Sequence, residues 1–149
     1  MVMWQLTIDA NDPARLVRFW APLLGYEIQP PPAGFDSWVD WYRSRGVPEE
    51  ELAGDPEDLV DRIHDPSGRG PNIWFQIVPE HKTLKNRFHL DVYATDRDPT
   101  LSIDERRAIV EAKVAEVVAA GATLGHRTVG PDSYFALMHD PEGNEFCIA

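Results

Sequence analysis

The sequence predicts an α+β fold that is built from two copies of one small βαβββ module. The turn sequence Asp-Pro-x-Gly occurs twice, at residues 65–68 and 140–143, and a short apolar strand follows it each time. In each half, an alternating strand, a helix with an acidic or hydroxyl residue at its start, and a glycine precede this turn. Such a repeat indicates two units that face each other. Paired units enclose a cleft, and clefts are where small ligands bind.

A chain of 149 residues is about the length of one domain. We therefore expect a single domain over residues 1–149, with module one at about residues 1–80 and module two at about residues 86–149.

In the first half, residues 3–9 alternate between apolar and polar side chains, which is typical of a half-buried strand. A helix is expected over residues 12–25, because an Asp-Pro pair favours a helix start and a glycine favours a helix end. Short strands are expected at residues 26–28 and 72–78. The apolar face of the first strand consists of Trp4, Leu6 and Ile8.

In the second half, residues 87–94 alternate again, and residues 102–105 form a capping-box sequence at the start of a helix that extends to about residue 120. A strand begins near residue 123, and residues 134–149 read as a hairpin around the second Asp-Pro-x-Gly turn. In the strand over residues 87–94, the apolar face consists of Phe88, Leu90 and Val92.

Residues 30–64 depart from the repeat, and we interpret them as an insertion in module one, beside or over the cleft. They contain two helix-like pieces, around residues 46–48 and 54–56. Trp38, Trp41 and Tyr42 share one helical face, which favours ordinary packing over ligand contact, although Trp38 stays a candidate for substrate binding. Between residues 36 and 65, ten Asp and Glu stand against three Arg, which is typical of a solvated acidic surface.

The composition excludes several classes of function. A formal net charge of −11 argues against nucleic acid as a partner, because such binding depends on Lys and Arg at the phosphates. No apolar run approaches the length of a membrane helix, and the N-terminus does not resemble a secretory signal. The single cysteine, Cys147, excludes an intrachain disulfide. We therefore expect a cytoplasmic protein with no membrane partner.

Strand alternation also predicts which polar side chains meet. If each helix covers the apolar face of its own sheet, the opposite faces line the space between the modules. The side chains expected there are Gln5, Thr7, Gln76, His89, Asp91, Tyr93, Glu145 and Cys147. Imidazole and carboxylate groups bind divalent metals, and an amide oxygen adds a weaker bond. Cys147 is expected to serve mainly in packing, because no basic neighbour in the sequence would lower its thiol pKa.

The segments DPARLVRFWAPLLGYE, VPEHKTLKNRFHLDV and DPEGNEFCIA resemble the glyoxalase-like domains of the vicinal oxygen chelate superfamily. The resemblance covers nearly all of the chain outside the acidic insertion, and it implies a curved eight-stranded sheet around a cleft. It also implies a homodimer, with the cleft either within one chain or across the dimer. The implied metal ligands are Gln5, His89 and Glu145, with Gln76 as a less certain fourth. This sequence departs from the family's pattern at Gln5, because the family commonly has a histidine at that metal-ligand position.

The resemblance implies two functions. The first is a metal-dependent lyase, isomerase or dioxygenase, in which Zn, Ni, Fe, Mn or Co chelates oxygens of a small-molecule substrate and stabilises an oxyanion. In that case Glu145 is a metal ligand or, moved off the metal, the general base. The second is a metal-free protein that binds or sequesters an antibiotic-like molecule. The residues expected to contact the ligand are Thr7, Trp38, Gln76, Asp91 and Tyr93.

Overall fold

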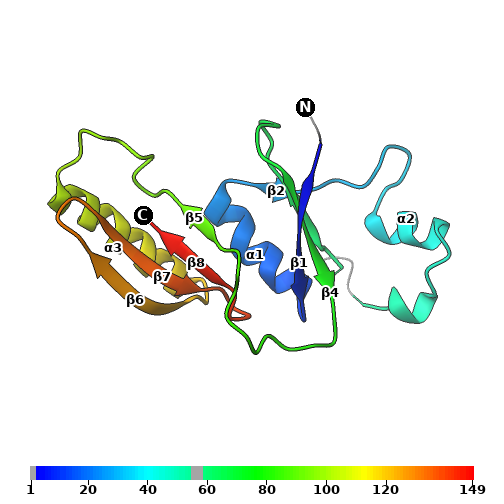
Figure 1. Ribbon diagram of the computed structural model, residues 1–149. Coiled ribbons are helices and arrows are strands. Elements are labelled where there is room, and N and C mark those ends of the chain that lie inside the picture. The colour runs from blue at the N-terminus through cyan, green and yellow to red at the C-terminus, as the bar shows by residue number, and fades with distance from the viewer. Residues whose placement is uncertain (1–2, 55–58) are drawn as a thin grey trace. The chain divides into compact units, whose positions relative to one another are not determined.

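The computed structural model describes residues 3–54 and 59–149, and the chain divides into two compact units, residues 1–80 and 81–149. Each unit contains a four-stranded sheet and a long helix (Figure 1). The described residues form eight strands, and the strand–helix–three-strand order of each unit confirms the predicted α+β class with two βαβββ modules. None of the helices in the described residues combines the length and the apolar character that a membrane span requires.

The first unit holds the sheet order β1-β4-β3-β2, in which β1 and β4 are parallel and the other neighbours are antiparallel. Its elements are β1 (Gln5–Ala10), α1 (Pro13–Leu24), β2 (Glu27–Ile28), α2 (Trp38–Ser44), the short 3-10 helix η1 (Glu49–Glu51), β3 (Arg62–His64) and β4 (Asn72–Ile77). The Asp12 side chain caps α1 by accepting the N–H of Arg15, and Gly25 ends the helix with a φ of 66°. Both predicted helix ends are thus confirmed.

The second unit repeats this connectivity with the sheet order β5-β8-β7-β6. Its elements are β5 (Leu90–Val92), α3 (Ile103–Ala119), β6 (Thr123–Val129), β7 (Tyr134–His139) and β8 (Glu145–Ile148). Ser102 and Glu105 form the predicted capping box at the start of α3. In both units the long helix covers one face of its own sheet. The buried residues of that layer in the second unit are Val110, Val114, Val117, Ala136, Met138, Phe146 and Ile148.

The two Asp-Pro-x-Gly turns have the same internal chemistry. The Asp65 carboxylate accepts the backbone N–H groups of Ser67, Arg69 and Gly70, and the Asp140 carboxylate accepts those of Glu142 and Asn144. The fourth residue of each turn, Gly68 or Gly143, has a φ of 68° or 87°, a region that suits glycine. The repeated turn therefore meets the same backbone requirement in both modules. Three residues separate it from β4, the strand beside β1, and one residue separates it from β8, the strand beside β5.

The strands are shorter than the alternation predicts. Trp4 lies before β1 and is 67% exposed, and Phe88 lies before β5 and is 90% exposed, so neither packs under its helix as expected. Both residues precede the hydrogen-bonded part of their sheet. Hydrogen-bonded pairing begins at Gln5 with Asn72 in one sheet and at Leu90 with Phe146 in the other. Periodicity identifies a face but does not fix where pairing stops.

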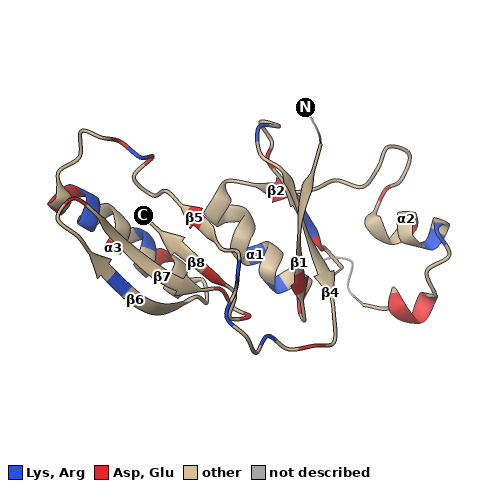
Figure 2. Ribbon diagram, in the orientation of Figure 1, with Lys and Arg blue, Asp and Glu red and all other residues tan. Residues whose placement is uncertain are grey.

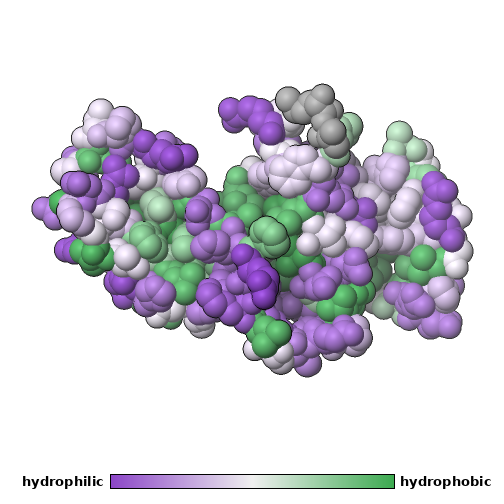
Figure 3. All heavy atoms as spheres, in the orientation of Figure 1, coloured by the Kyte–Doolittle hydropathy of each residue, from purple (hydrophilic) through white to green (hydrophobic). Residues whose placement is uncertain are grey.

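The insertion is also shorter than predicted, because β3 lies within the range 30–64 and belongs to the sheet of the module. The helix-like piece before residues 46–48 is α2, which Ser37 caps. The second piece, around residues 54–56, lies partly outside the described residues. Acidic residues gather in η1 (Figure 2), and at the right of the space-filling view strongly hydrophilic residues are mixed with near-neutral and hydrophobic ones (Figure 3).

Candidate functional site

The open face of the second sheet carries a row of polar side chains from β5 and β8. Asp91 pairs with Cys147 in the parallel register, so the two side chains point to the same side of the sheet. His89 and Glu145 lie two residues earlier in their segments and share that face. The neighbouring pair, Leu90 and Phe146, points to the α3 side, where Phe146 is fully buried.

His89, Asp91 and Cys147 form a compact group of potential metal ligands. One donor atom from each lies within 4.8 Å of the others, and Cys147 Sγ lies 3.8 Å from His89 Nδ1. A tetrahedral zinc site with ordinary Zn–S and Zn–N bonds separates sulfur from nitrogen by about 3.6 Å. His89 and Asp91 are exposed while Cys147 is buried, so an ion would be held at the sheet surface and reached from solvent. This donor set fits a divalent metal.

The Cys147 thiol is in its protonated form when no metal is bound. Burial raises the pKa of Cys147, and the negative charge and hydrogen bond of Asp91 raise it further. A metal-bound cysteine is a thiolate, so ligation would displace this proton. The raised pKa means that the thiol is not activated, as expected from the lack of basic neighbours in the sequence. Cys147 does more than pack, however, because its sulfur lies close to the potential metal donors of His89 and Asp91.

Glu145 is engaged by the chain itself. Its Oε2 accepts the ammonium of Lys85 at 2.9 Å and the backbone N–H of Asn86 at 3.0 Å, and its Oε1 lies 3.9 Å from His139 Nε2. The hydrogen bond from Lys85 is the main cause that lowers the pKa of Glu145, which is therefore ionised at neutral pH. An ionised carboxylate suits a metal ligand. Because Lys85 is 74% exposed, little holds it in place.

The other predicted site residues divide between the two units. Gln5 and Thr7 are exposed in β1, and their register partners place them on the same face of the first sheet as Trp74. Gln76 pairs with Asp9 on that face and is half-buried. Tyr93 is 43% exposed, and its ring lies under the guanidinium of Arg97 at 4.8 Å. Whether Gln5 joins His89 and Glu145 at one metal stays a prediction.

Trp38 has a structural role in the first unit. Its indole N–H donates to the carbonyl of Gln29 at 2.7 Å, and the Arg62 guanidinium lies 3.9 Å from its ring centre. These contacts favour the packing interpretation of the α2 aromatic residues, because they hold α2 to the sheet.

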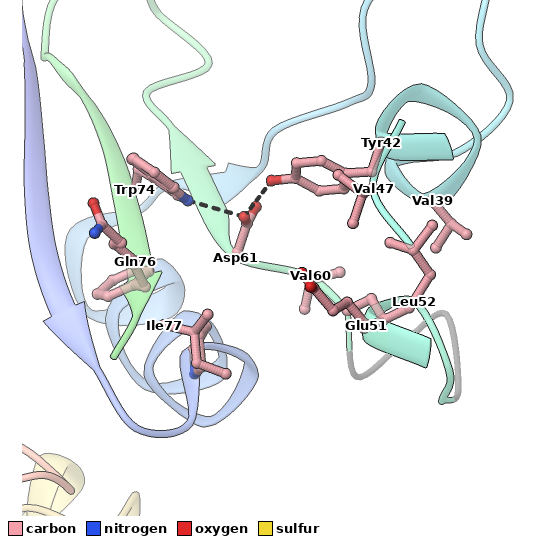
Figure 4. Close-up of a pocket in the computed structure, with 13 residues that line it drawn as sticks. Val39, Tyr42, Val47, Glu51, Leu52, Val60, Asp61, Trp74, Gln76 and Ile77 are labelled. Carbon is pink, nitrogen blue, oxygen red and sulfur yellow. Dashed lines mark hydrogen bonds between the residues drawn. The ribbon is translucent and has the colours of Figure 1, made fainter. Parts of the chain in front are cut away.

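The first unit also contains a cavity of about 300 Å³ between the insertion and β4, which sequence reasoning missed (Figure 4). Tyr42, Asp61 and Gln76 are among its lining residues. The apolar face of α2 and the acidic side chains around it were visible in the sequence, but only the fold shows that they stand against β4. Cys147 as a donor was missed as well, although its alternation with Glu145 was the signal that could have found it.

Comparison with known proteins identifies the family. The model of the glyoxalase-like domain family matches residues 5–149. The chain belongs to the glyoxalase-like domain family. This match confirms the resemblance to the vicinal oxygen chelate superfamily. No curated protein matches the sequence significantly.

Solved structures show the same fold for this glyoxalase-like protein. A hypothetical protein of S. aureus is 14% identical with a TM-score of 0.58, and the match covers 99% of this chain and 92% of that one. A glyoxalase/bleomycin resistance protein/dioxygenase family enzyme from Burkholderia phytofirmans PsJN is 17% identical with a TM-score of 0.55, with coverage of 97% and 94%. A glyoxalase-related enzyme from Fulvimarina pelagi is 16% identical with a TM-score of 0.54, with coverage of 100% and 86%. At such identities the likeness concerns the fold alone.

Proposed function

We propose that this glyoxalase-like protein binds a divalent metal on the open face of its second sheet and uses the site to hold an oxygen-bearing small molecule. The observation that supports it is the mutual proximity of donor atoms from His89, Asp91 and Cys147, all within 4.8 Å. Imidazole, carboxylate and thiolate together suit Zn²⁺, Co²⁺, Ni²⁺ or Fe²⁺ better than Mn²⁺, which prefers oxygen donors.

In this proposal the residues of the chain divide the work. His89 supplies the neutral nitrogen donor, Cys147 supplies the buried sulfur, and Asp91 supplies an exposed carboxylate that can rotate to the ion or to the substrate. When bound, the metal supplies Lewis-acid stabilisation of a substrate oxyanion, as lyase, isomerase and dioxygenase reactions require. Glu145 is ionised and lies two residues before Cys147 in β8. Once Lys85 moves away, its carboxylate can bind the metal as a further ligand or accept a proton from the substrate.

Metal titration of the purified protein tests the proposal. The wild type should take up about one Zn²⁺ or Co²⁺ per chain in calorimetry, and His89→Ala should abolish measurable uptake, because the imidazole is the strongest neutral donor of the group. The matched control is His126→Ala, which removes an exposed histidine from β6 in the same sheet. Equal uptake by His89→Ala and His126→Ala would overturn the assignment.

Two features favour the second candidate, a metal-free binding protein. Glu145 already has cationic and backbone partners in Lys85 and Asn86. The predicted ligand Gln5 would offer only a weak amide donor, at a position where the resemblance to the family leads us to expect histidine. Under this alternative the wild type has no affinity for first-row divalent ions, and a bound small molecule is insensitive to His89→Ala. The same calorimetric series therefore separates the two functions.

A further inference from the structure

The cavity of the first unit has two walls that come from different parts of the chain. One wall comes from the insertion, through α2, η1 and the residues that flank η1, and the other comes from β4 and the segment 59–61 (Figure 4). Its volume of about 300 Å³ lies at the lower end of the range for small-molecule sites. The apolar residues that line it are Pro13, Val39, Val47, Leu52, Leu59, Val60, Phe75 and Ile77.

Hydrogen bonds to Asp61 tie the two walls together. The hydroxyl of Tyr42, from the insertion, donates to Asp61 Oδ2 at 2.7 Å, and the indole N–H of Trp74, from β4, donates to the same oxygen at 2.9 Å (Figure 4). The Arg62 guanidinium pairs with the other oxygen at 2.7 Å and neutralises the carboxylate. The Asp61 charge is therefore compensated within the protein and is not left for a ligand.

Glu51 is different, because no described residue compensates its charge. Within the part of the chain that the structure describes, its carboxylate has no hydrogen-bond or ion-pair partner, although it lines the cavity. The described residues that line the cavity include no Lys, Arg or His. The segment 36–65 around it has a formal charge of −7. A cation is therefore the charged group that this cavity accommodates at the lowest electrostatic cost.

We propose that this cavity binds an organic ammonium ion with an apolar body. The body lies between the insertion and β4, and the ammonium group pairs with Glu51 at the η1 wall. The proposal depends on neither function proposed above, since every residue that it uses belongs to the first unit and none belongs to the metal-ligand group. It also gives the insertion a role, because α2 and η1 form the wall of the cavity that lies opposite β4.

Calorimetric titration with three probes of similar shape tests the proposal on the full chain without added metal. Phenethylamine is the cation, phenethyl alcohol is the neutral probe and phenylacetate is the anion. Affinity should fall in that order. Glu51→Gln should weaken phenethylamine about three- to fivefold, the range of a partly exposed ion pair, and should leave the alcohol unchanged. The matched control is Glu50→Gln, which removes the same charge from the neighbouring residue that does not line the cavity.

Two further variants locate the bound probe. Val39→Phe, which fills the cavity from α2, should weaken both the amine and the alcohol, whereas His89→Ala should change neither. The proposal is overturned if the amine and the alcohol bind equally, if Glu51→Gln and Glu50→Gln have equal effects, if Val39→Phe has none, or if no probe binds at millimolar concentration. Glu51 is exposed and has no partner in the described chain, so its replacement tests the charge without disturbing the fold.

Discussion

Cys147 Sγ lies 3.8 Å from Nδ1 of His89, although 58 residues separate the two in the chain. The contact arises because β5 and β8 are parallel neighbours, in the same arrangement that pairs β1 with β4 in the first unit. Each module thus brings the beginning of its sequence against its end. In the second unit this topology brings an imidazole, a carboxylate and a thiol together on one open face.

The Cys147 sulfur should be visible in the spectrum of the cobalt-loaded protein. Wild type is expected to show a sulfur-to-cobalt charge-transfer band, and Cys147→Ser should lose the band and bind Co²⁺ at least about tenfold more weakly, because a hydroxyl is a much poorer donor than a thiolate. Absorption spectroscopy during a Co²⁺ titration measures both effects. If the wild type binds Co²⁺ tightly without showing this band, Cys147 is not a ligand and the carboxylates bind the ion in its place.

Gln5 tests whether the first unit contributes to the metal. Gln5→His should tighten Zn²⁺, Ni²⁺ or Co²⁺ binding, because imidazole is a better donor than an amide oxygen, and Gln5→Ala should weaken it less than His89→Ala does. Calorimetry on the three variants gives the comparison. If neither change at Gln5 alters the affinity, the second unit binds the metal without it.

Phe146 and Phe88 should differ sharply although the sequence places both on apolar strand faces. Phe146 is fully buried and Phe88 is 90% exposed. Phe146→Ala should lower the free energy of unfolding by about 3–5 kcal/mol through lost burial and the cavity it leaves. Phe88→Ala should change it by less than about 0.5 kcal/mol. Urea denaturation followed by circular dichroism measures both, and a large cost at Phe88 would indicate that another surface covers it.

The Asp61 network should contribute more to stability than the surface ion pair of the same insertion. Asp61 and Arg62 are each 16% exposed, and removal of the carboxylate leaves Arg62, Tyr42 and Trp74 without their shared partner. Asp61→Ala should therefore cost about 2–4 kcal/mol. Glu49→Ala, which breaks the exposed pair with Arg43, should cost at most about 1 kcal/mol. Equal losses in urea denaturation would show that the network does not hold the insertion.

Glu111 should give the protein an acid-sensitive contribution to stability. Hydrogen bonds from Arg127 and Tyr134 lower the pKa of Glu111 from its ordinary 4.5 to about 2. A lowered folded-state pKa means that this contribution is complete above about pH 4.5 and is lost as the pH falls toward 2. Because the Glu111–Arg127 pair is partly exposed, its size should not exceed about 1 kcal/mol.

The comparison that isolates Glu111 is the stability of wild type and Glu111→Gln from pH 7 to pH 2. The difference should be largest at pH 7 and should vanish near pH 2. In an Arg127→Gln background, where the first hydrogen-bond donor is missing, the same substitution should have a much smaller effect. A difference that does not change with pH would contradict the assignment.

Features that depend on local chemistry could be predicted from the amino-acid sequence alone. The Asp-Pro-x-Gly turns, the Asp12 and Ser102 caps and the glycine that ends α1 all satisfy backbone groups within a few residues, so their patterns could be read directly. Two repeats of these signals gave the βαβββ order. The alternation in β8 also placed Glu145 and Cys147 on one face, because side chains in a strand alternate with a period of two.

Contacts that depend on which strands are neighbours in a sheet could be seen only in the folded structure. Trp4 and Phe88 lie before the paired parts of their sheets and are exposed, and the parallel register of β5 and β8 brought Cys147 to His89. The cavity in the first unit needed α2 and η1 to stand against β4, through a carboxylate at Asp61 that the sequence shows only as one acid among ten. Such contacts join residues far apart in the chain, and local periodicity contains no information on their distance.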